Sequence, residues 1–148
     1  MEKQLEQPIP IKGFKKENHF LSNFAISTVW WEGVSFPTVE HAYQAAKSEN
    51  VDDHLRIAEL TFAGEAKKEG RSLLLRDDWE EIKEEVMYDL CSQKFKNKVL
   101  KEKLLATGNC YLEETNEWGD IFWGVCGGIG QNKLGKTLMQ IRKEHKNV

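Results

Sequence analysis

Three polar side chains with complementary chemistry fall on one flank of a predicted helix. Residues 38–47 read Thr-Val-Glu-His-Ala-Tyr-Gln-Ala-Ala-Lys, and a 3.6-residue period aligns Glu40, Gln44 and Lys47. The flank adjoins an apolar stripe that should pack inward. An acid, an amide and an amine beside a buried edge fit the wall of a pocket, but the helix alone is equally compatible with a solvated flank. The stripe consists of Val39, Ala42, Tyr43 and Ala46.

Glu40 and Asp120 are acids in segments rich in aromatic residues, unlike the acids of the Lys/Glu-rich segments. Paired carboxylates are what glycoside cleavage requires, because they stabilise an oxocarbenium-like transition state and transfer protons. Lys47, desolvated near apolar surface, could instead attack a carbonyl as a Schiff-base nucleophile. Arg71 could hold a phosphate group in a bidentate geometry. His41 follows Glu40 directly but points about 100° away around the helix, so its neighbourhood alone implies no catalytic dyad.

The elements that must position these groups follow from local patterns. Thr38 is the predicted N-cap of the first helix, and Glu40 lies in its first turn. Before it, residues 26–31 and 34–36 form a predicted hairpin around Gly33. Further helices are predicted from Asp52 as a cap, over 62–70, from Asp77 as a cap to about residue 95, and over 99–107. A strand is expected at 111–113, a glycine-rich loop at 118–132, and a last helix capped by Asn132.

These patterns predict an α+β fold: a compact, predominantly helical single domain with a small antiparallel hairpin near the N-terminus. Residues 1–10 are expected to form a flexible arm and residues 11–148 one catalytic domain, because no repeat or linker divides them. Of the 148 residues, 40% are hydrophobic and 30% charged, which is typical of a globular protein.

Composition excludes several functional classes. The formal net charge of −3 provides no global positive field for nucleic acid. No apolar run has the length of a membrane span, and the polar N-terminal segment lacks the apolar core of a signal peptide. Cys91, Cys110 and Cys126 form neither a zinc pattern nor a disulfide framework. We therefore expect a reduced, cytoplasmic protein without a metal or another cofactor, and no association with membranes.

Residues 130–137 match the Walker A pattern, but a phosphate-binding loop is not expected there. No alternation of strands and helices precedes the match. Leu134 and Leu138 continue the helical period through the supposed loop. The match is therefore interpreted as the start of the last helix.

Taken together, the ordered motifs resemble those of the NADAR (NAD- and ADP-ribose-associated) family from Phe20 onward, over nearly the whole chain. The set is more specific than any one motif in it. The matching segments are Leu21-Ser22-Asn23-Phe24, Phe36-Pro37-Thr38 with Glu40-His41, Tyr43-Gln44-Ala45 with Lys47, Ala66-Lys67 with Gly70-Arg71, Asp120 with Trp123-Gly124, and Gly130, Asn132 and Leu134-Gly135.

The resemblance implies hydrolysis of a bond between ribose C1 and a nitrogen. Family members include N-glycosidases acting on phosphorylated riboflavin-pathway intermediates, and hydrolases that remove ADP-ribose from modified bases in DNA. The resemblance identifies catalytic candidates in Glu40, Lys47 and Asp120. The residues implied to bind substrate are Ser22, Asn23, Phe24, His41, Gln44, Arg71, Trp123, Gly124 and Asn132.

The partner implied is an ADP-ribosyl or ribosyl-phosphate small molecule, with ADP-ribosylated DNA as a further substrate; the oligomeric state is not predicted. Residues 125–129 are apolar where riboflavin-type members carry acids, which favours ADP-ribose removal. The alternatives are cleavage of a riboflavin-pathway intermediate and a non-catalytic module that binds ADP-ribose or NAD. The presence of all three catalytic candidates favours an enzyme.

Overall fold

A single short helix, α1 (Val39–Ala46), lies at the centre of the fold, and every one of its residues is buried. The computed structural model describes residues 8–148, so most of the arm predicted over residues 1–10 lies outside the described residues. Three other helices surround α1, namely α2 (Val51–Ala58), α3 (Ala63–Gly70) and α4 (Trp79–Lys94). The expected inward-facing stripe is therefore confirmed, but the polar flank of α1 is buried as well.

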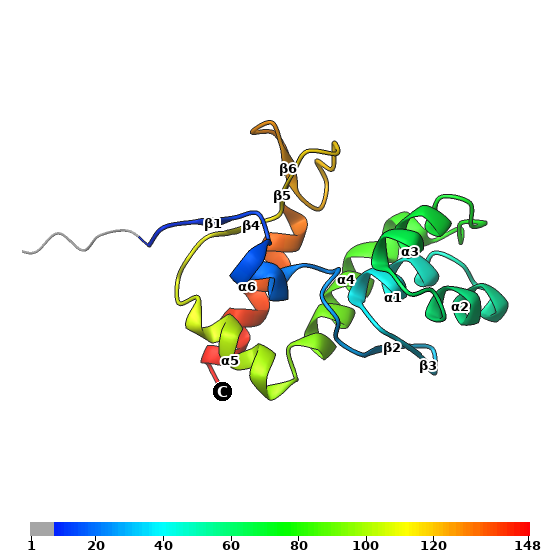
Figure 1. Cartoon of the computed structure of the whole chain (residues 1–148), viewed down its shortest axis with the longest axis horizontal. Helices are drawn as coiled ribbons and strands as arrows, with labels where there is room; N and C mark the ends of the chain where they lie inside the picture. Colours follow the sequence, from blue (N-terminus) through cyan, green and yellow to red (C-terminus); the bar gives the residue numbers. More distant parts are fainter. Residues whose placement is uncertain (1–7) are drawn as a thin grey trace, which may run out of the picture.

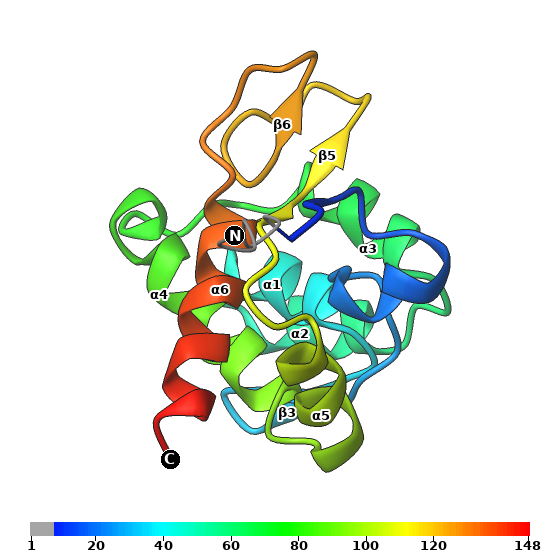
Figure 2. The same ribbon diagram turned by 90° about the vertical axis from the view of Figure 1, so that its left-hand side faces the viewer.

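Apart from the hairpin of residues 29–36, which packs against α1, α2 and α4, the remaining elements form a second group on the other side of α4 (Figure 1). Helix α6 (Lys133–Lys146) contacts α4, α5 (Lys98–Ala106) and β4 (Leu112–Glu113). The short 3₁₀ helix η1 (Lys16–Leu21) leads from this group to the first one. Figure 2 shows that β5 (Thr115–Asn116) and β6 (Val125–Cys126) lie together beyond the N-terminal end of α6.

The predicted hairpin is confirmed, and two further strand pairs accompany it. Strands β2 (Val29–Trp31) and β3 (Val34–Phe36) pair antiparallel, with Gly33 at a φ of 81° in the turn. Strand β1 (Ile11–Lys12) pairs parallel with β4, and β5 pairs parallel with β6. Both parallel pairs join segments distant in sequence or separated by a loop. The α+β class predicted from the sequence is confirmed.

Two predicted helix caps are shifted by one or two residues. Thr38 caps α1 as expected, since its hydroxyl accepts a hydrogen bond from the backbone N–H of His41. Helix α2 is capped by Asn50 rather than Asp52, because the Asn50 side chain accepts from the N–H of Asp52 at 2.8 Å. The N-cap position of α4 is Asp78 rather than its neighbour, and its carboxylate binds Arg76 instead of the helix.

The core is continuous between the two groups of helices. Large side chains from α1, α4, α5 and α6 meet in it, and removing them from water provides the main driving force for folding. Among residues 8–148, no helix combines the length and the apolar character needed to cross a membrane. Fully buried members include Leu21, Phe36, Met87, Leu90, Phe95, Leu104, Leu112, Leu138 and Ile141.

Candidate active site

A cavity of about 420 Å³ opens where the two groups of elements meet. Its volume lies within the range typical of sites for small molecules. Side chains reach it from α1, from the segment around η1, from the C-terminal end of α3 and from the chain between β4 and β6. Nine residues predicted from the sequence line it together: Ser22, Asn23, Phe24, Glu40, Gln44, Lys47, Arg71, Asp120 and Trp123.

Glu40 is a buried carboxylate on the pocket wall, only 7% exposed. One oxygen accepts a hydrogen bond of 2.8 Å from the side-chain amide of Gln44. Burial raises the pKa of Glu40, and the Gln44 hydrogen bond and the positive charges of Lys67 and Lys47 oppose this shift. Glu40 is therefore suited to gain or lose a proton during a reaction.

The amide of Gln44 reaches Glu40 only because residue 70 is a glycine. A Cβ atom at Gly70 would lie 1.8 Å from Gln44 Oε1. That oxygen is buried and has no hydrogen-bond partner among the described residues. An unpartnered amide oxygen next to a pocket is available to a ligand that carries a donor.

Lys47 lies at the C-terminal end of α1 and is partly buried. Burial lowers its pKa, as do the nearby positive charges of Arg71, Lys83 and Lys67, whereas Glu40 raises it. Its ammonium group lies 5.6 Å from the centroid of the Tyr43 ring. A lowered pKa increases the fraction of neutral amine, which is the form that attacks carbonyl carbon.

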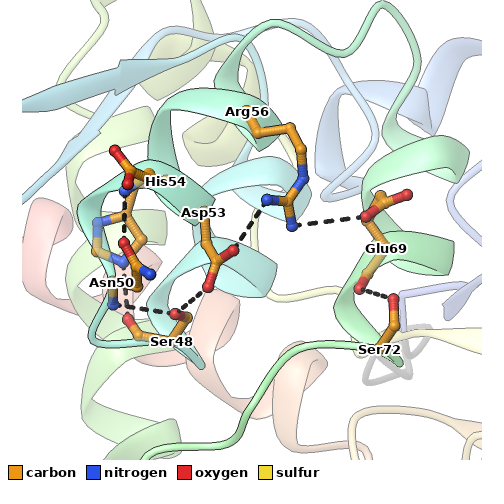
Figure 3. Close-up of polar contacts among 8 residues, drawn as sticks. Ser48, Asn50, Asp53, His54, Arg56, Glu69 and Ser72 are labelled. Atoms are coloured by element: carbon orange, nitrogen blue, oxygen red, sulfur yellow. Dashed lines mark hydrogen bonds and ion pairs between the residues drawn. The ribbon is translucent and has the colours of Figure 1, made fainter.

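The backbone that carries Lys47 is held at its own carbonyl and at the residue that follows. Its carbonyl accepts from the N–H of Arg76 at 2.8 Å. In the next residue, the Ser48 hydroxyl donates to Asp53 and its carbonyl accepts from His54 Nε2 at 2.7 Å (Figure 3). This turn fixes where the lysine side chain begins.

The same network reaches the helix that supplies two other pocket cations. Arg56 of α2 contacts Asp53 at 2.9 Å and Glu69 of α3 at 3.7 Å (Figure 3). The ion pair with Glu69 is half-exposed, so it adds little stability. It nevertheless joins α2 to the end of α3, from which Lys67 and Arg71 extend to the pocket.

Asp120 organises the loop between β5 and β6. Its Oδ1 accepts hydrogen bonds from the backbone N–H groups of Phe122 and Trp123, at 3.1 and 2.9 Å. The indole of Trp123 in turn donates to the Tyr43 hydroxyl at 3.0 Å. Burial and the nearby carboxylates of Glu40 and Asp120 raise the pKa of that hydroxyl well above its ordinary value, although the Trp123 hydrogen bond opposes the shift, so it stays neutral. Asp120 therefore both lines the pocket and places an aromatic wall.

The loop that carries Ser22 and Asn23 is anchored to α1 and α4. The Asn23 carbonyl accepts from the N–H of Glu40 at 3.1 Å, and the Ser22 carbonyl accepts from the ammonium group of Lys94 at 2.7 Å. Lys94 is only 1% exposed, and burial lowers its pKa to about 8. These contacts hold Ser22 and Asn23 against the pocket.

Three residues predicted to bind substrate do not line the cavity. His41 is fully buried, with Nε2 donating to the Leu60 carbonyl at 2.9 Å and Nδ1 accepting from the Thr38 hydroxyl at 2.7 Å. Gly124 and Asn132 are buried beside the strands behind the pocket. Asn132 is also not a side-chain cap, because it adopts a φ of 52° and its amide binds the chain near β4.

Residues 130–137 do not form a phosphate-binding loop. Most of the segment belongs to α6, and Gly135 packs inside that helix. A Cβ atom at Gly135 would lie 2.1 Å from the Leu112 carbonyl. Gly135 and Asn132 therefore serve close packing of α6 on β4, and the segment is the start of the last helix, as predicted.

Several pocket residues were not predicted from the sequence. Lys67 belongs to a motif of the resemblance, and its ammonium group lies 4.7 Å from the centroid of the exposed Trp118 ring. Lys15 and Glu114 lie in segments without a chemical motif, and no local pattern singled them out. Within residues 8–148, no group of His, Cys, Asp and Glu side chains has the arrangement of a metal site.

The NADAR domain model matches residues 11–146. N-glycosidase YbiA of Escherichia coli is 36% identical over 127 residues, which cover 83% of this chain and 79% of YbiA. The NMR structure of E. coli YbiA superposes with a TM-score of 0.84 at 33% identity, covering 97% of this chain and 88% of that one.

A longer relative also aligns along nearly the full chain. A riboflavin biosynthesis protein of Vibrio vulnificus is 36% identical over 144 residues, which is 95% of this chain. The chain spans only 39% of that relative's length.

Proposed function

The chain belongs to the NADAR family, and from this premise we propose that it is an N-glycosidase that cleaves a bond between ribose C1 and nitrogen. The observation that carries the proposal is one pocket containing three carboxyl groups and four cationic side chains. The naming of YbiA as an N-glycosidase supports it. The carboxyl groups are Glu40, Glu114 and Asp120, and the cations are Lys15, Lys47, Lys67 and Arg71.

The pocket suits a substrate that combines a phosphorylated sugar with a flat base. Lys67 and Arg71 provide positive charge for phosphate. Trp118 and Phe24 are exposed at the cavity, 58% and 40% respectively, and offer ring faces for stacking. The buried carboxyl of Glu40 faces the same space and can stabilise positive charge at C1.

Two routes remain for the chemical step after the C1–N bond is weakened. In the first, Glu40 or Asp120 orients and activates a water that attacks C1. In the second, the ribose ring opens and Lys47 attacks C1, displacing the nitrogen as the free amine and forming a Schiff base that water then hydrolyses, with Glu40 as the proton partner of Lys47. The lowered pKa of Lys47 supports the second route, and the hydrogen bond between Gln44 and Glu40 supports the first.

Two substrate classes follow from different observations. The name of the Vibrio relative supports a phosphorylated riboflavin-pathway intermediate. A second hollow of about 320 Å³ supports the larger ADP-ribosyl group, because it shares Lys15, Thr115 and Trp118 with the pocket and adds Lys12 and Lys16. An ADP-ribosyl conjugate of a nucleobase could extend into it, whereas a monophosphate could not. The apolar residues 125–129 give no support to either substrate, because none of them lines the pocket.

The test is incubation of the purified protein with both substrate classes, followed by mass spectrometry of the released ribosyl product. We expect Glu40→Gln and Lys47→Ala each to lower the turnover number by about 10²-fold or more, as loss of acid–base or nucleophilic groups does. A protein that binds ADP-ribose but releases no product from either class would instead be a binding module. Near-wild-type rates in both variants would refute the assignment of the site.

Borohydride distinguishes the two routes. Added during turnover, it should reduce a Schiff base and leave a covalent adduct on Lys47. Peptide mapping of the trapped protein locates the adduct, and Lys47→Arg serves as the control that cannot form it. An unmodified Lys47 after productive turnover would favour attack by water.

A further inference from the structure

Glu114 is a pocket carboxyl that has no role in either of the two routes. It lies between β4 and β5, and its side chain lines the cavity. Its Oε2 is buried and has no hydrogen-bond partner among residues 8–148. An ionised carboxylate oxygen left without a partner in a buried place is costly. The arrangement therefore favours the protonated carboxyl, which can donate its proton to an acceptor atom of the substrate.

The backbone of Glu114 is clamped at both of its polar groups. Its N–H donates to the side-chain oxygen of Asn132 at 3.0 Å, and its carbonyl accepts from the N–H of Val125 at 2.9 Å. The Asn132 amide nitrogen also donates to the Leu112 carbonyl at 2.9 Å. Asn132 thus fixes the chain on both sides of Glu113 and sets the origin of the Glu114 side chain.

Gly124 leaves the space that this side chain needs. A Cβ atom at residue 124 would lie 3.0 Å from Glu114 Cγ and 2.2 Å from the Glu114 carbonyl oxygen. Any larger residue would push the strand and its carboxyl away. Gly124 and Asn132 were expected to touch substrate, but both instead hold Glu114 in place.

The other charged groups around the pocket differ from Glu114 in their partners. Glu40 accepts a hydrogen bond from Gln44, and Asp120 Oδ1 is engaged by two backbone N–H groups. Burial, together with the charges of Asp120 and Glu40, raises the pKa of Glu114 to about 7, against the opposing effect of Lys67 and Lys15. Lys47 and Arg71 complete the charged lining. Among the three carboxyl groups, Glu114 is the one whose buried oxygen has no donor.

We propose that Glu114 is the general acid of this site, the group that protonates the leaving nitrogen. The inference rests on the proposed N-glycosidase function. The electron pair of the C1–N bond passes to the nitrogen, which takes the proton of the Glu114 carboxyl. Water oriented by Glu40 or Asp120 then adds to the oxocarbenium carbon and loses a proton to the Glu114 carboxylate, so that the sum is substrate plus water giving the phosphorylated ribosyl product and the free amine.

The kinetic test is Glu114→Gln, which keeps the shape of the side chain but has no carboxyl proton. We expect the turnover number to fall by about 10²- to 10⁴-fold, with little change in KM. In the wild type, kcat/KM should fall on the alkaline side of the pH profile as Glu114 loses its proton, and this fall should be absent in Glu114→Gln. Glu102→Gln, an exposed change on α5 that lines neither the pocket nor the second hollow, should keep the wild-type rate and profile.

A second measurement needs no substrate. In protein labelled with ¹³C at the glutamate carboxyls, the resonance missing from Glu114→Gln should titrate near pH 7 in the wild type. Titration in the ordinary range near 4.5 would overturn the proposal, as would wild-type turnover in Glu114→Gln or an alkaline limb that persists in it. A wild-type protein that releases no ribosyl product would refute the proposed function instead, while the titration still decides whether Glu114 holds a proton.

Discussion

Gly70→Ala provides a sharp test of the candidate site, because it moves one pocket contact without removing any polar group. Gly70 is buried at the end of α3. The new methyl carbon would lie 1.8 Å from Gln44 Oε1 and 2.7 Å from Gln44 Cδ. Both atoms belong to the outer part of a flexible side chain, so the amide can swing toward the cavity. Gln44 Cβ lies 3.3 Å from the same position, a tight contact that a small shift between α3 and α1 relieves.

This movement of the amide breaks the hydrogen bond of 2.8 Å that Gln44 donates to Glu40. Hydrogen bonds to charged groups contribute about 1.5–3 kcal/mol. Since 1.4 kcal/mol is a factor of ten, we expect kcat/KM to fall about 10- to 150-fold. The hydrogen bond lowers the pKa of Glu40, so its loss should raise that pKa and move the acidic limb of the pH profile to higher pH.

The assay is the pH dependence of kcat/KM, with the melting temperature of each variant measured alongside. Gly64→Ala is the matched control in the same helix, because a Cβ atom there has no neighbour within 4 Å. It should leave the kinetics unchanged and keep or raise the melting temperature, since alanine favours helix over glycine.

A double-mutant cycle decides whether the effect passes through Gln44. If it does, Gly70→Ala combined with Gln44→Ala should be no worse than Gln44→Ala alone. Additive losses, or an unchanged acidic limb in Gly70→Ala, would refute the reasoning.

Two further predictions concern the scaffold. Asn132→Ala should lower the free energy of unfolding by about 1–3 kcal/mol, because it leaves a buried N–H and a buried carbonyl without partners; urea unfolding measures this. Asn132→Gly, in which glycine tolerates the φ of 52°, should lose less free energy of unfolding than Asn132→Ala. Equal losses in the two variants would exclude a contribution from backbone strain. Burial lowers the pKa of Lys94 from 10.5 to about 8 in the folded protein. The charged lysine therefore lowers the free energy of unfolding by its full amount below pH 8, and this destabilisation disappears as the pH rises toward 10.5. Urea unfolding should therefore show wild type gaining stability relative to Lys94→Met between pH 8 and 10.5. Burial raises the pKa of Cys91 to about 12 and the Lys94 charge opposes this shift, so both proteins in the comparison carry Cys91→Ala; a difference independent of pH would contradict the assignment.

Local sequence patterns were sufficient for the elements that depend on neighbouring residues. The cap at Thr38, the turn at Gly33 and the start of the third helix near Phe62 are all set by contacts over a few residues. The same short range explains the misplaced cap of α2. Asn50 and Asp52 are both competent caps; in the structure the Ser48 hydroxyl accepts from the N–H of Asn50, and the Asn50 side chain accepts from the N–H of Asp52.

The candidate catalytic groups on α1 were predicted because they share one helix flank. Whether that flank is solvated or forms a pocket wall could not follow from its period. Helices α2, α3 and α4 all pack against α1, and these contacts bury Glu40 and Gln44. The sequence alone identified the residues, and the surrounding helices determined that they face a cavity.

Glu114 shows what only the tertiary structure decided. No periodic pattern or motif marks it, because its setting depends on pairings between distant segments. Its backbone is held by Asn132 and Val125, and its side chain fits beside Gly124. The sequence by itself determined which chemical groups the protein possesses and which short elements carry them. The long-range packing of α6 on β4, and of β6 beside β5, determined which groups share one desolvated cavity, because burial and charge proximity arise only when those segments meet.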